Sequence, residues 1–296
     1  MKSGKIRTFS FATLLLCVYE PATSFVFSSS VHQRTRTSTT TTTTSTSTST
    51  STTHLNMGGG WHQTWKNILV EGGSKRWKVD DRNIKKQALA TIQQYASSSS
   101  ASNKESLNIL CPLAGDDPFV HEAWVQGHSV TSIDLVPEAV DSMREQFNDD
   151  SDDKATWTKD DATEPNTVVW KHSSGRATLY VGDMLQKRSE LNEKFDVVYD
   201  KDSFGALDKD MRRPYCERLA EFLKDDGIVY TEVKYKENPE SRMSGPPFHV
   251  GKDDLMESTS FGNTKFDYVD GLGSIYDLGM PGMSQTAHIL KRTPRT

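Results

Sequence analysis

Four predicted strands each end in residues that could bind or orient a small polar ligand. The carboxyl ends of parallel strands meet at one edge of a sheet, so these residues converge if the strands run parallel. Carboxylates there can accept hydrogen bonds from ribose hydroxyls, and a glycine lets a ligand approach the backbone closely. The four strand ends carry Leu113 and Gly115, Asp134, Asp183 and Met184, and Asp200 and Lys201.

Strands and helices alternate along the body of the chain that must position these residues. A short, mostly apolar strand is expected from Leu107 until the break at Pro112, and apolar residues at helical spacing resume at Phe119. Such alternation predicts an α/β fold with a mainly parallel, doubly wound sheet. Further strands are expected at residues 129–134, 167–171 and 177–181 (a hairpin), 195–200, 228–233, 265–269 and 285–291, and helices at 81–95, 138–146, 209–223 and 253–260.

The loop after the first strand, Pro112-Leu-Ala-Gly-Asp-Asp, lacks the pattern of a dinucleotide site. A pyrophosphate site has the spacing G-x-G-x-x-G, whereas this loop holds only Gly115 and two carboxylates, Asp116 and Asp117. Carboxylates repel a pyrophosphate but suit a cationic ligand without phosphates, such as S-adenosylmethionine. The loop therefore favours a methyltransferase over the alternative, an NAD(P)-dependent Rossmann oxidoreductase.

Two other features each allow a structural and a functional interpretation. Asp134 stands where an acid reaches ribose hydroxyls in doubly wound sheets, and it can equally cap the helix that begins at Pro137. Trp61 and Trp65 are four residues apart and share one face of a predicted helix, where they can cover a ligand or seal the core. The spacing alone favours the core for this pair, and Trp77 follows it.

The first 56 residues have the composition of a targeting leader. Residues 1–24 combine basic residues with an apolar stretch too short to span a bilayer as a mature helix, which predicts a signal peptide. Residues 25–56 are rich in Ser and Thr, poor in acids and contain arginine, which predicts a disordered transit peptide. This order, with Phe25 after the signal, resembles the two-part leaders of algae whose plastids lie inside extra membranes. Plastid import is expected, with secretion as the alternative.

Charge and cysteine content exclude several classes of protein. The net charge of −5 over 296 residues gives no indication of a nucleic-acid partner. Cys111 and Cys216, the cysteines outside the leader, have no paired spacing, so buried, reduced thiols are expected rather than a disulfide framework or a zinc site. The absence of metal-ligand spacing predicts a metal-independent reaction. The acid-rich residues 149–161 are expected to form a solvated loop, and residues 97–102 a flexible linker.

Five stretches of the body match one family in order and spacing. They are Pro112-Leu-Ala-Gly, Gly127-His-Ser-Val, Ser173-Ser-Gly-Arg-Ala-Thr-Leu-Tyr, Phe195-Asp-Val-Val-Tyr-Asp and Gly245-Pro-Pro-Phe-His-Val. On these stretches, residues 61–291 resemble the thiopurine S-methyltransferase family, which also includes thiol and halide methyltransferases. The resemblance implies a seven-stranded, Rossmann-like class I methyltransferase sheet with an antiparallel last strand. It places the methyltransferase domain at residues 57–296, with a helical lid and linker at 57–103.

The resemblance also implies a role for each candidate residue, with S-adenosylmethionine as cofactor. Leu113 and Gly115 would line the methionine end of the cofactor, and Asp134 would bind its ribose. The remaining assignments are Trp61, Trp65 and Trp77 as a lid over cofactor and substrate, Asp183 and Met184 beside the adenine, and Asp200 and Lys201 near the methyl group.

Two positions depart from the family pattern. Asp116 stands where the family usually has Lys, and Lys201 replaces the Arg of an Asp-Arg pair, which removes a planar, bidentate fork. The changes weaken the case for a thiopurine and favour a small thiol, bisulfide or halide as methyl acceptor. Lys201 could also pair with the cofactor carboxylate, or form a surface ion pair with Asp200 or Asp202.

Methyl transfer from a sulfonium depends mainly on alignment of nucleophile, methyl carbon and sulfur. Candidate bases or orienting groups are Asp200, His249 and His121, with His249 the first to test; a loop histidine bonded to backbone is an equal interpretation for it. We expect a monomer that acts on a small molecule, without a nucleic-acid partner or a membrane-bound mature form. The alternative of a different class is a non-catalytic module that binds S-adenosylmethionine or S-adenosylhomocysteine.

Overall fold

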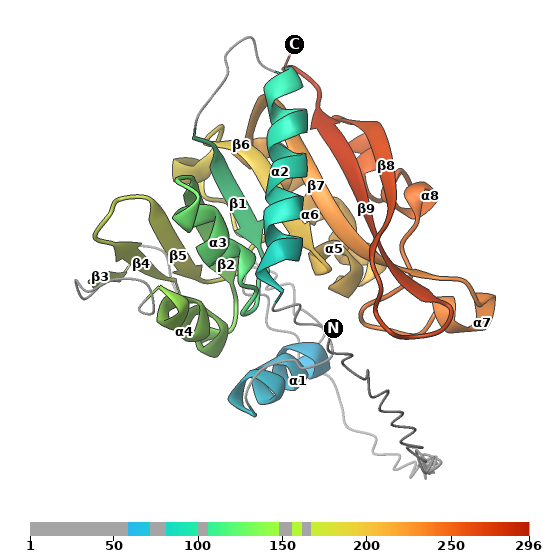
Figure 1. Ribbon diagram of the computed structural model, residues 1–296, viewed down its shortest axis with the longest axis horizontal. Coiled ribbons are helices and arrows are strands. Elements are labelled where there is room, and N and C mark those ends of the chain that lie inside the picture. Colours follow the sequence, from blue (N-terminus) through green and yellow to red (C-terminus); the bar gives the residue numbers. More distant parts are fainter. Residues whose placement is uncertain (1–58, 72–80, 100–105, 148–155, 162–166, 296) are drawn as a thin grey trace, which may run out of the picture. The chain divides into compact units, whose positions relative to one another are not determined.

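The computed structural model describes residues 59–71, 81–99, 106–147, 156–161 and 167–295, which belong to one compact unit, His54–Thr296 (Figure 1). The predicted signal peptide (1–24), the predicted transit peptide (25–56) and Trp77 lie outside the described residues.

Five neighbouring strands run parallel and form the centre of the sheet (Figure 1). Their order is β5-β2-β1-β6-β7, so the chain winds outward in both directions from β1, as the alternating pattern predicted. The bounds are β1 Asn108–Pro112, β2 Ser129–Asp134, β5 Ala177–Val181, β6 Phe195–Lys201 and β7 Leu223–Lys236.

Antiparallel strands extend the parallel core at both edges. On one side β4 (Val168–His172) pairs with β5, and β3 (Trp157–Asp161) pairs with β4. On the other side β9 (Met283–Arg292) pairs with β7, and β8 (Phe266–Tyr276) pairs with β9. The implied antiparallel last strand is therefore confirmed. The described sheet, however, has nine strands instead of the seven expected.

Strand β3 is the part of the sheet that the sequence pattern did not predict. It lies within residues 149–161, which were expected to form a solvated acidic loop, and that expectation is wrong for Trp157–Asp161. Charges on an edge strand are compatible with pairing because they face solvent and discourage further strand addition. Asp160 pairs with Lys171 of β4 at 3.1 Å, so one of the acids supports the strand.

Helices cover both faces of the sheet, and their ends differ from expectation at three places. Helix α2 continues through Ser99, where a linker was expected from residue 97; α6 ends at Phe222 and β7 begins at once; α8 is only four residues long. The helices are α1 Gly59–Val70, α2 Arg82–Ser99, α3 Phe119–Val125, α4 Pro137–Gln146, α5 Ser203–Ala206, α6 Lys209–Phe222, α7 Pro239–Arg242 and α8 Lys252–Leu255, with 3-10 turns at Ser189–Leu191 and Phe261–Asn263.

Two apolar clusters hold the helices on the sheet, one on each face. Alternate residues of a strand point to opposite faces, so Ile109 packs with α2 and α3 while Leu110 packs with α6. Cys111 and Cys216 are both free and buried, as predicted. Within the described ranges no helix is long and apolar enough to cross a membrane.

Candidate functional site

The loop after β1 is held in an unusual backbone conformation. Leu113 has φ 46° and Gly115 has φ 60°, and a non-glycine residue in this left-handed region costs energy and often marks a functional site. The amide of Gly115 donates to Asp134 Oδ2 at 2.9 Å, and the amide of Val136 donates to Asp134 Oδ1 at 2.9 Å. One carboxylate therefore ties the end of β1 to the end of β2.

The indole of Trp65 lies directly over Gly115. A Cβ atom at position 115 would be 2.6 Å from Trp65 Cζ2, so only glycine leaves room for the ring. Helix α1, which carries Trp65, is linked to α4 by the ion pair of Lys66 and Glu138 at 3.1 Å. Trp61 lies in the same helix, but its side chain is outside the described part of the structure. The structure thus brings Trp65 to the predicted cofactor loop.

The two carboxylates of the β1 loop are both buried, and one of them is neutralised. Asp117 Oδ2 accepts a hydrogen bond from Lys85 Nζ at 2.8 Å, and its Oδ1 accepts the amide of Phe119 at the start of α3. The charge of Asp117 is thus used inside the protein and is not available to a ligand. Asp116 is also buried, and its carbonyl accepts from Gln146 of α4.

Asp183 and Met184, expected beside the adenine of the cofactor, follow the end of β5 and both make contacts within the protein. Asp183 Oδ1 accepts the amide of Leu185 at 2.8 Å, which forms a tight turn. Met184 is buried in the apolar cluster that faces α6. Gly182 faces the guanidinium of Arg188, since a Cβ there would be 2.6 Å from its nitrogen.

Asp200, at the end of β6, is fully buried and bonded inside the protein. Its Oδ1 accepts the amides of Ser203 and Phe204 at 3.0 and 3.2 Å, and its Oδ2 accepts the hydroxyl of Tyr215 at 2.8 Å. Burial raises the pKa of Asp200 to about 7, although these hydrogen bonds act in the opposite direction. Asp200 therefore fixes the turn into α5.

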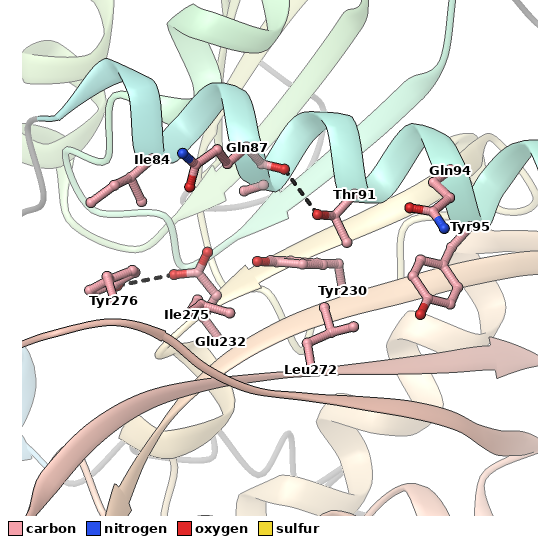
Figure 2. Close-up of a pocket in the computed structure, with 11 residues that line it drawn as sticks. Ile84, Gln87, Thr91, Gln94, Tyr95, Tyr230, Glu232, Leu272, Ile275 and Tyr276 are labelled. Carbon is pink, nitrogen blue, oxygen red and sulfur yellow. Dashed lines mark hydrogen bonds between the residues drawn. The ribbon is translucent and has the colours of Figure 1, made fainter.

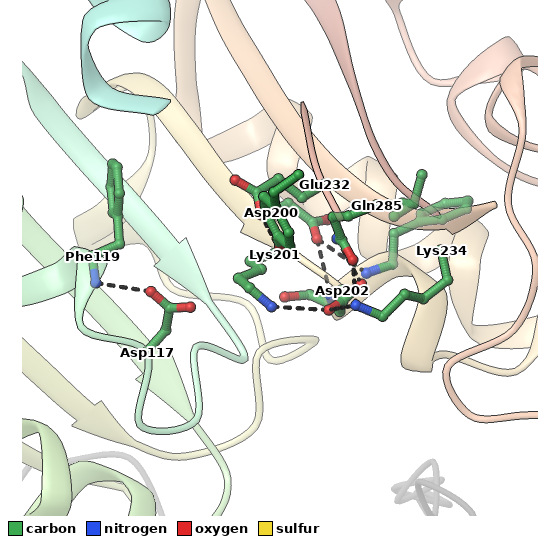
Figure 3. Close-up of polar contacts among 12 residues, drawn as sticks. Asp117, Phe119, Asp200, Lys201, Asp202, Glu232, Lys234 and Gln285 are labelled. Atoms are coloured by element: carbon green, nitrogen blue, oxygen red, sulfur yellow. Dashed lines mark hydrogen bonds and ion pairs between the residues drawn. The ribbon is translucent and has the colours of Figure 1, made fainter. Parts of the chain in front are cut away.

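Lys201 takes part in a buried charge network (Figure 3). Lys201 Nζ and Lys234 Nζ approach Asp202 Oδ2 at 3.0 and 3.1 Å from neighbouring strands. Gln285 of β9 donates to Asp202 Oδ1 at 3.1 Å and accepts from Lys234. Of the alternatives weighed for Lys201, the structure shows the ion pair with Asp202, and the pair is largely buried, with side-chain exposures of 7% and 16%.

The pKa values in this network follow from burial and opposite charge. Burial alone would raise the pKa of Asp202, but Lys201 and Lys234 outweigh it and lower the pKa to about 2. Burial alone would lower the pKa of Lys201, but Asp202, Asp117 and Glu232 raise it. Asp202 also has φ 60°, so a second non-glycine residue at a strand end occupies the left-handed region.

The histidines named by the sequence lie in two different environments. His249 accepts the amide of Lys236 on Nδ1 at 2.9 Å, and its Nε2 is 3.7 Å from Asp254, which matches the interpretation of a loop histidine bonded to backbone. Burial lowers the pKa of His249. His121 is buried against the rings of Trp124 and Phe147 in an aromatic cluster on α3 and α4.

Three charged residues of this edge were not singled out from the sequence. Lys85 lies on the apolar stripe of α2, with Ala88, Leu89 and Ile92, and a lone cation in that stripe was the available signal. The others are Glu232 and Lys234, both in the carboxyl-terminal half of the central strand β7. Among the residues that the structure describes, no group of three or more His, Cys, Asp or Glu could hold a metal ion.

Comparison with known proteins gives one family and one fold. A family model described as Thiopurine S-methyltransferase (TPMT) matches residues 58–288. The thiopurine S-methyltransferase of Acinetobacter baylyi is 26% identical over 154 residues, which cover 52% of this chain and 67% of the relative. A probable thiopurine S-methyltransferase of Danio rerio is 23% identical over 202 residues, covering 68% of this chain and 79% of that protein.

Among solved structures, the chain is similar to a methyltransferase of Burkholderia thailandensis that acts on 1,6-didemethyltoxoflavin. That crystal structure contains its substrate and S-adenosylhomocysteine. The TM-score is 0.54 at 14% sequence identity, and the match covers 80% of this chain and 88% of the other. At this identity the likeness shows a shared fold.

Proposed function

The chain belongs to the thiopurine S-methyltransferase family, and we propose that it transfers a methyl group from S-adenosylmethionine to a small thiol, bisulfide or halide. Membership of the family makes the chain a methyltransferase that depends on S-adenosylmethionine, so the oxidoreductase alternative is set aside. The acceptor and the roles of individual residues are the proposed part.

The observation that carries the proposal is the position of the Trp65 ring against Gly115 at the end of β1. When bound, the cofactor supplies an electrophilic methyl group on a positively charged sulfur. An indole face attracts such a cation, and the missing side chain at Gly115 lets this ring lie against the loop. The carboxylate of Asp134 accepts the amide of Gly115 on one oxygen and that of Val136 on the other, at the strand end where doubly wound sheets place the ribose of a cofactor. These residues fit the cofactor.

The other strand ends support a small acceptor. Lys201 is bound to Asp202 inside the protein and offers no planar cationic fork for a large anionic substrate. Asp200 is a positioning residue, because it fixes the backbone turn after β6 and has no exposed surface. We assign His249 a positioning role as well, since its Nδ1 holds the amide of Lys236. A ring over the loop excludes water and favours a poorly hydrated nucleophile.

The proposal is tested with the purified protein, labelled S-adenosylmethionine and a panel of iodide, bisulfide, small thiols, a thiopurine and arsenite, with volatile products trapped. We expect labelled product from at least one thiol, bisulfide or iodide, and little from the thiopurine. Binding of the cofactor without any product across the panel would contradict the proposal and support the non-catalytic module.

Asp134→Ala tests the assignment of the β1–β2 edge to the cofactor. We expect the Kd for S-adenosylmethionine, measured by calorimetry, to rise at least tenfold, because the loop amides and the ribose lose one acceptor. Asp141→Ala, on the exposed side of α4, is the matched control and should bind normally. Unchanged affinity in Asp134→Ala would remove Asp134 from the site.

We further propose that residues 1–56 direct the protein to a plastid, on the composition of that leader. A fusion of these residues to a fluorescent protein should accumulate in plastids of an alga with multiply bounded plastids. Secretion of the fusion would contradict plastid delivery.

A further inference from the structure

Lys85 is a fully buried cation on the apolar face of helix α2. The other residues of that face, Ala88, Leu89 and Ile92, belong to the cluster that packs α2 against the sheet. Burial of an ammonium group is costly unless the group is paired and hydrogen-bonded. A methionine could pack at this position without that cost, so the partner of Lys85 must account for its charge.

The partner of Lys85 is Asp117, the last residue of the loop after β1. Lys85 Nζ lies 2.8 Å from Asp117 Oδ2, and the two side chains are 0% and 9% exposed. The amide of Asp117 donates to the carbonyl of Ala114 at 3.1 Å, which closes the turn that contains Gly115. The ion pair therefore anchors α2 to the turn on which Gly115 lies.

Four residues from four segments close a circuit around this ion pair. Asp117 Oδ1 accepts the amide of Phe119, the first residue of α3, at 2.8 Å (Figure 3). The ring of Phe119 stacks on the ring of Tyr199 in β6, with 3.6 Å between the ring centroids. Lys85 Nζ donates to the hydroxyl of Tyr199 at 3.4 Å. Helix α2, the loop, α3 and β6 are thus connected through Lys85.

A second carboxylate near Lys85, that of Glu232, is reached only through Tyr199. Glu232 lines a cavity of about 250 Å³ between α2 and strands β7 and β8 (Figure 2). It accepts the hydroxyl of Tyr199 at 3.3 Å, and Lys85 is not among the residues that line the cavity. Because the cavity separates α2 from β8, packing on that side constrains the helix less than the ion pair does. The charge of Lys85 is therefore committed to Asp117 and the loop after β1.

We propose that Lys85 is a positioning residue for methyl transfer, which holds the Asp117 turn, and with it Gly115, in the conformation that binds S-adenosylmethionine. The inference rests on the proposed function, in which this loop binds the cofactor. A loop that is ordered before its ligand arrives loses less of the binding free energy to ordering. Lys85 acts through Asp117 and does not itself contact the cofactor.

The expected defect of a variant without this cation is in cofactor binding and not in the chemical step. Without Lys85, the carboxylate of Asp117 is a buried charge without compensation, and the turn shifts to expose it to water. Bound cofactor can restore the turn at the expense of affinity. Once the turn is restored, nucleophile, methyl carbon and sulfur are aligned as in the wild-type protein.

Lys85→Met in the full chain tests the inference, because methionine keeps the length of the side chain and removes its charge. We expect the calorimetric Kd for S-adenosylmethionine to rise at least tenfold, and its KM to rise in parallel with an acceptor that gives product. The kcat at saturating cofactor should stay within about threefold of the wild-type value. Lys86→Met, at the next and exposed position of α2, is the matched control and should bind normally.

A second pair of variants separates stability from positioning. Leu89→Ala removes buried volume from the same face of α2, so it should lower the free energy of unfolding and leave the cofactor Kd unchanged. The double variant Lys85→Met/Asp117→Asn has no uncompensated charge, and asparagine can still accept the amide of Phe119. It should be more stable than Lys85→Met and yet bind the cofactor as weakly. If Lys85→Met does not fold, the double variant provides the same binding test.

Three outcomes would overturn the inference alone, provided that the wild-type protein binds S-adenosylmethionine. They are normal affinity in Lys85→Met, an equal loss of affinity in Leu89→Ala, and recovery of both stability and affinity in the double variant. A fall in kcat with an unchanged KM for the cofactor would also contradict a positioning role. Wild-type protein that does not bind S-adenosylmethionine would overturn the proposed function together with the inference.

Discussion

The two halves of the candidate site are built in different ways. At the ends of β1 and β2 the site consists of backbone amides, one glycine and a single carboxylate, Asp134, with Trp65 above. At the ends of β6 and β7 it consists of buried charged side chains, centred on Asp202, that satisfy each other. The first half is a surface shaped by main chain, and the second is a network of side chains.

Under the proposed function, the β1–β2 half would bind the cofactor and the β6–β7 half would select the acceptor. Backbone geometry changes little when side chains change, so the β1–β2 half suits a ligand that all members of a family share. A charge network changes with each substitution, because removal of one buried partner leaves another without compensation. We therefore expect the β6–β7 half to determine the acceptor and to be the less tolerant half.

The largest effect is expected for Asp200→Ala. The change leaves the amides of Ser203 and Phe204 and the hydroxyl of Tyr215 without an acceptor inside the protein. Each buried donor left unpaired costs ~1–3 kcal/mol, so the loss in free energy of unfolding should be about 3–5 kcal/mol. Denaturant unfolding measures this loss. A loss below about 1 kcal/mol, which is typical of a substitution on the surface, would show that the β6–β7 half is not the less tolerant half.

The pH dependence of stability has a sign that follows from the raised pKa of Asp200. Its folded pKa of about 7 exceeds the ordinary value of 3.8, so between these values the folded state binds more protons than the unfolded state. This stabilisation is complete below pH 3.8 and is lost as the pH rises through about 7. The free energy of unfolding of the wild-type protein, measured relative to that of Asp200→Asn, should therefore fall from pH 4 to pH 7. A difference that does not change with pH would mean that Asp200 is ionised over this whole range.

Lys234→Met should have an intermediate effect. The methionine keeps the length of the buried side chain but leaves Asp202 with Lys201 as its one lysine partner and takes a donor from Gln285. We expect a loss of about 1–3 kcal/mol in the free energy of unfolding. Lys171→Met, which breaks the exposed pair with Asp160, should cost only ~0–1 kcal/mol and is the control. Similar losses in the two variants would argue against a cooperative network.

Gly115→Ala is expected to act mainly on cofactor binding and only modestly on stability. Gly115 and Gly175 both have positive φ, yet only Gly115 faces an obstacle, since a Cβ at 175 has nothing within 4 Å. Gly175→Ala should lower the free energy of unfolding by ~1 kcal/mol through backbone strain alone. Gly115→Ala should lower it further and should weaken the binding of S-adenosylmethionine at least tenfold, as calorimetry would measure. Equal behaviour of the two variants would mean that Trp65 does not cover the loop in solution.

The two halves of the candidate site also differ in how much of each could be predicted from the sequence. The β1–β2 half depends on residues close in the chain, so the strand, the break at Pro112, the single glycine and Asp134 were all visible in the local pattern. The site roles of these residues await the binding measurements. Family membership was predicted from five short stretches spread over the body, and the doubly wound fold from the alternation of strands and helices.

The β6–β7 half could not be predicted because its contacts join distant segments. Lys85 lies 114 residues from Tyr199, and Gln285 lies 83 residues from Asp202. No local spacing links such pairs, and burial of a lysine on an apolar helix stripe is known only once its partner is placed. Strand β3 was missed for a related reason, because pairing with β4 outweighs its charged composition.

The antiparallel strand β9 has a consequence for how the protein folds. β8 is synthesised before β9 but joins the sheet only through it, since β9 lies between β7 and β8. Until β9 arrives, the edge of β7 is unpaired and β8 has no partner in the sheet, so this side cannot form as the chain leaves the ribosome. The contacts of β9 with β7 span many residues, which favours slow closure. This edge of the sheet is therefore completed last, after all the strands of the β1–β2 half have been synthesised.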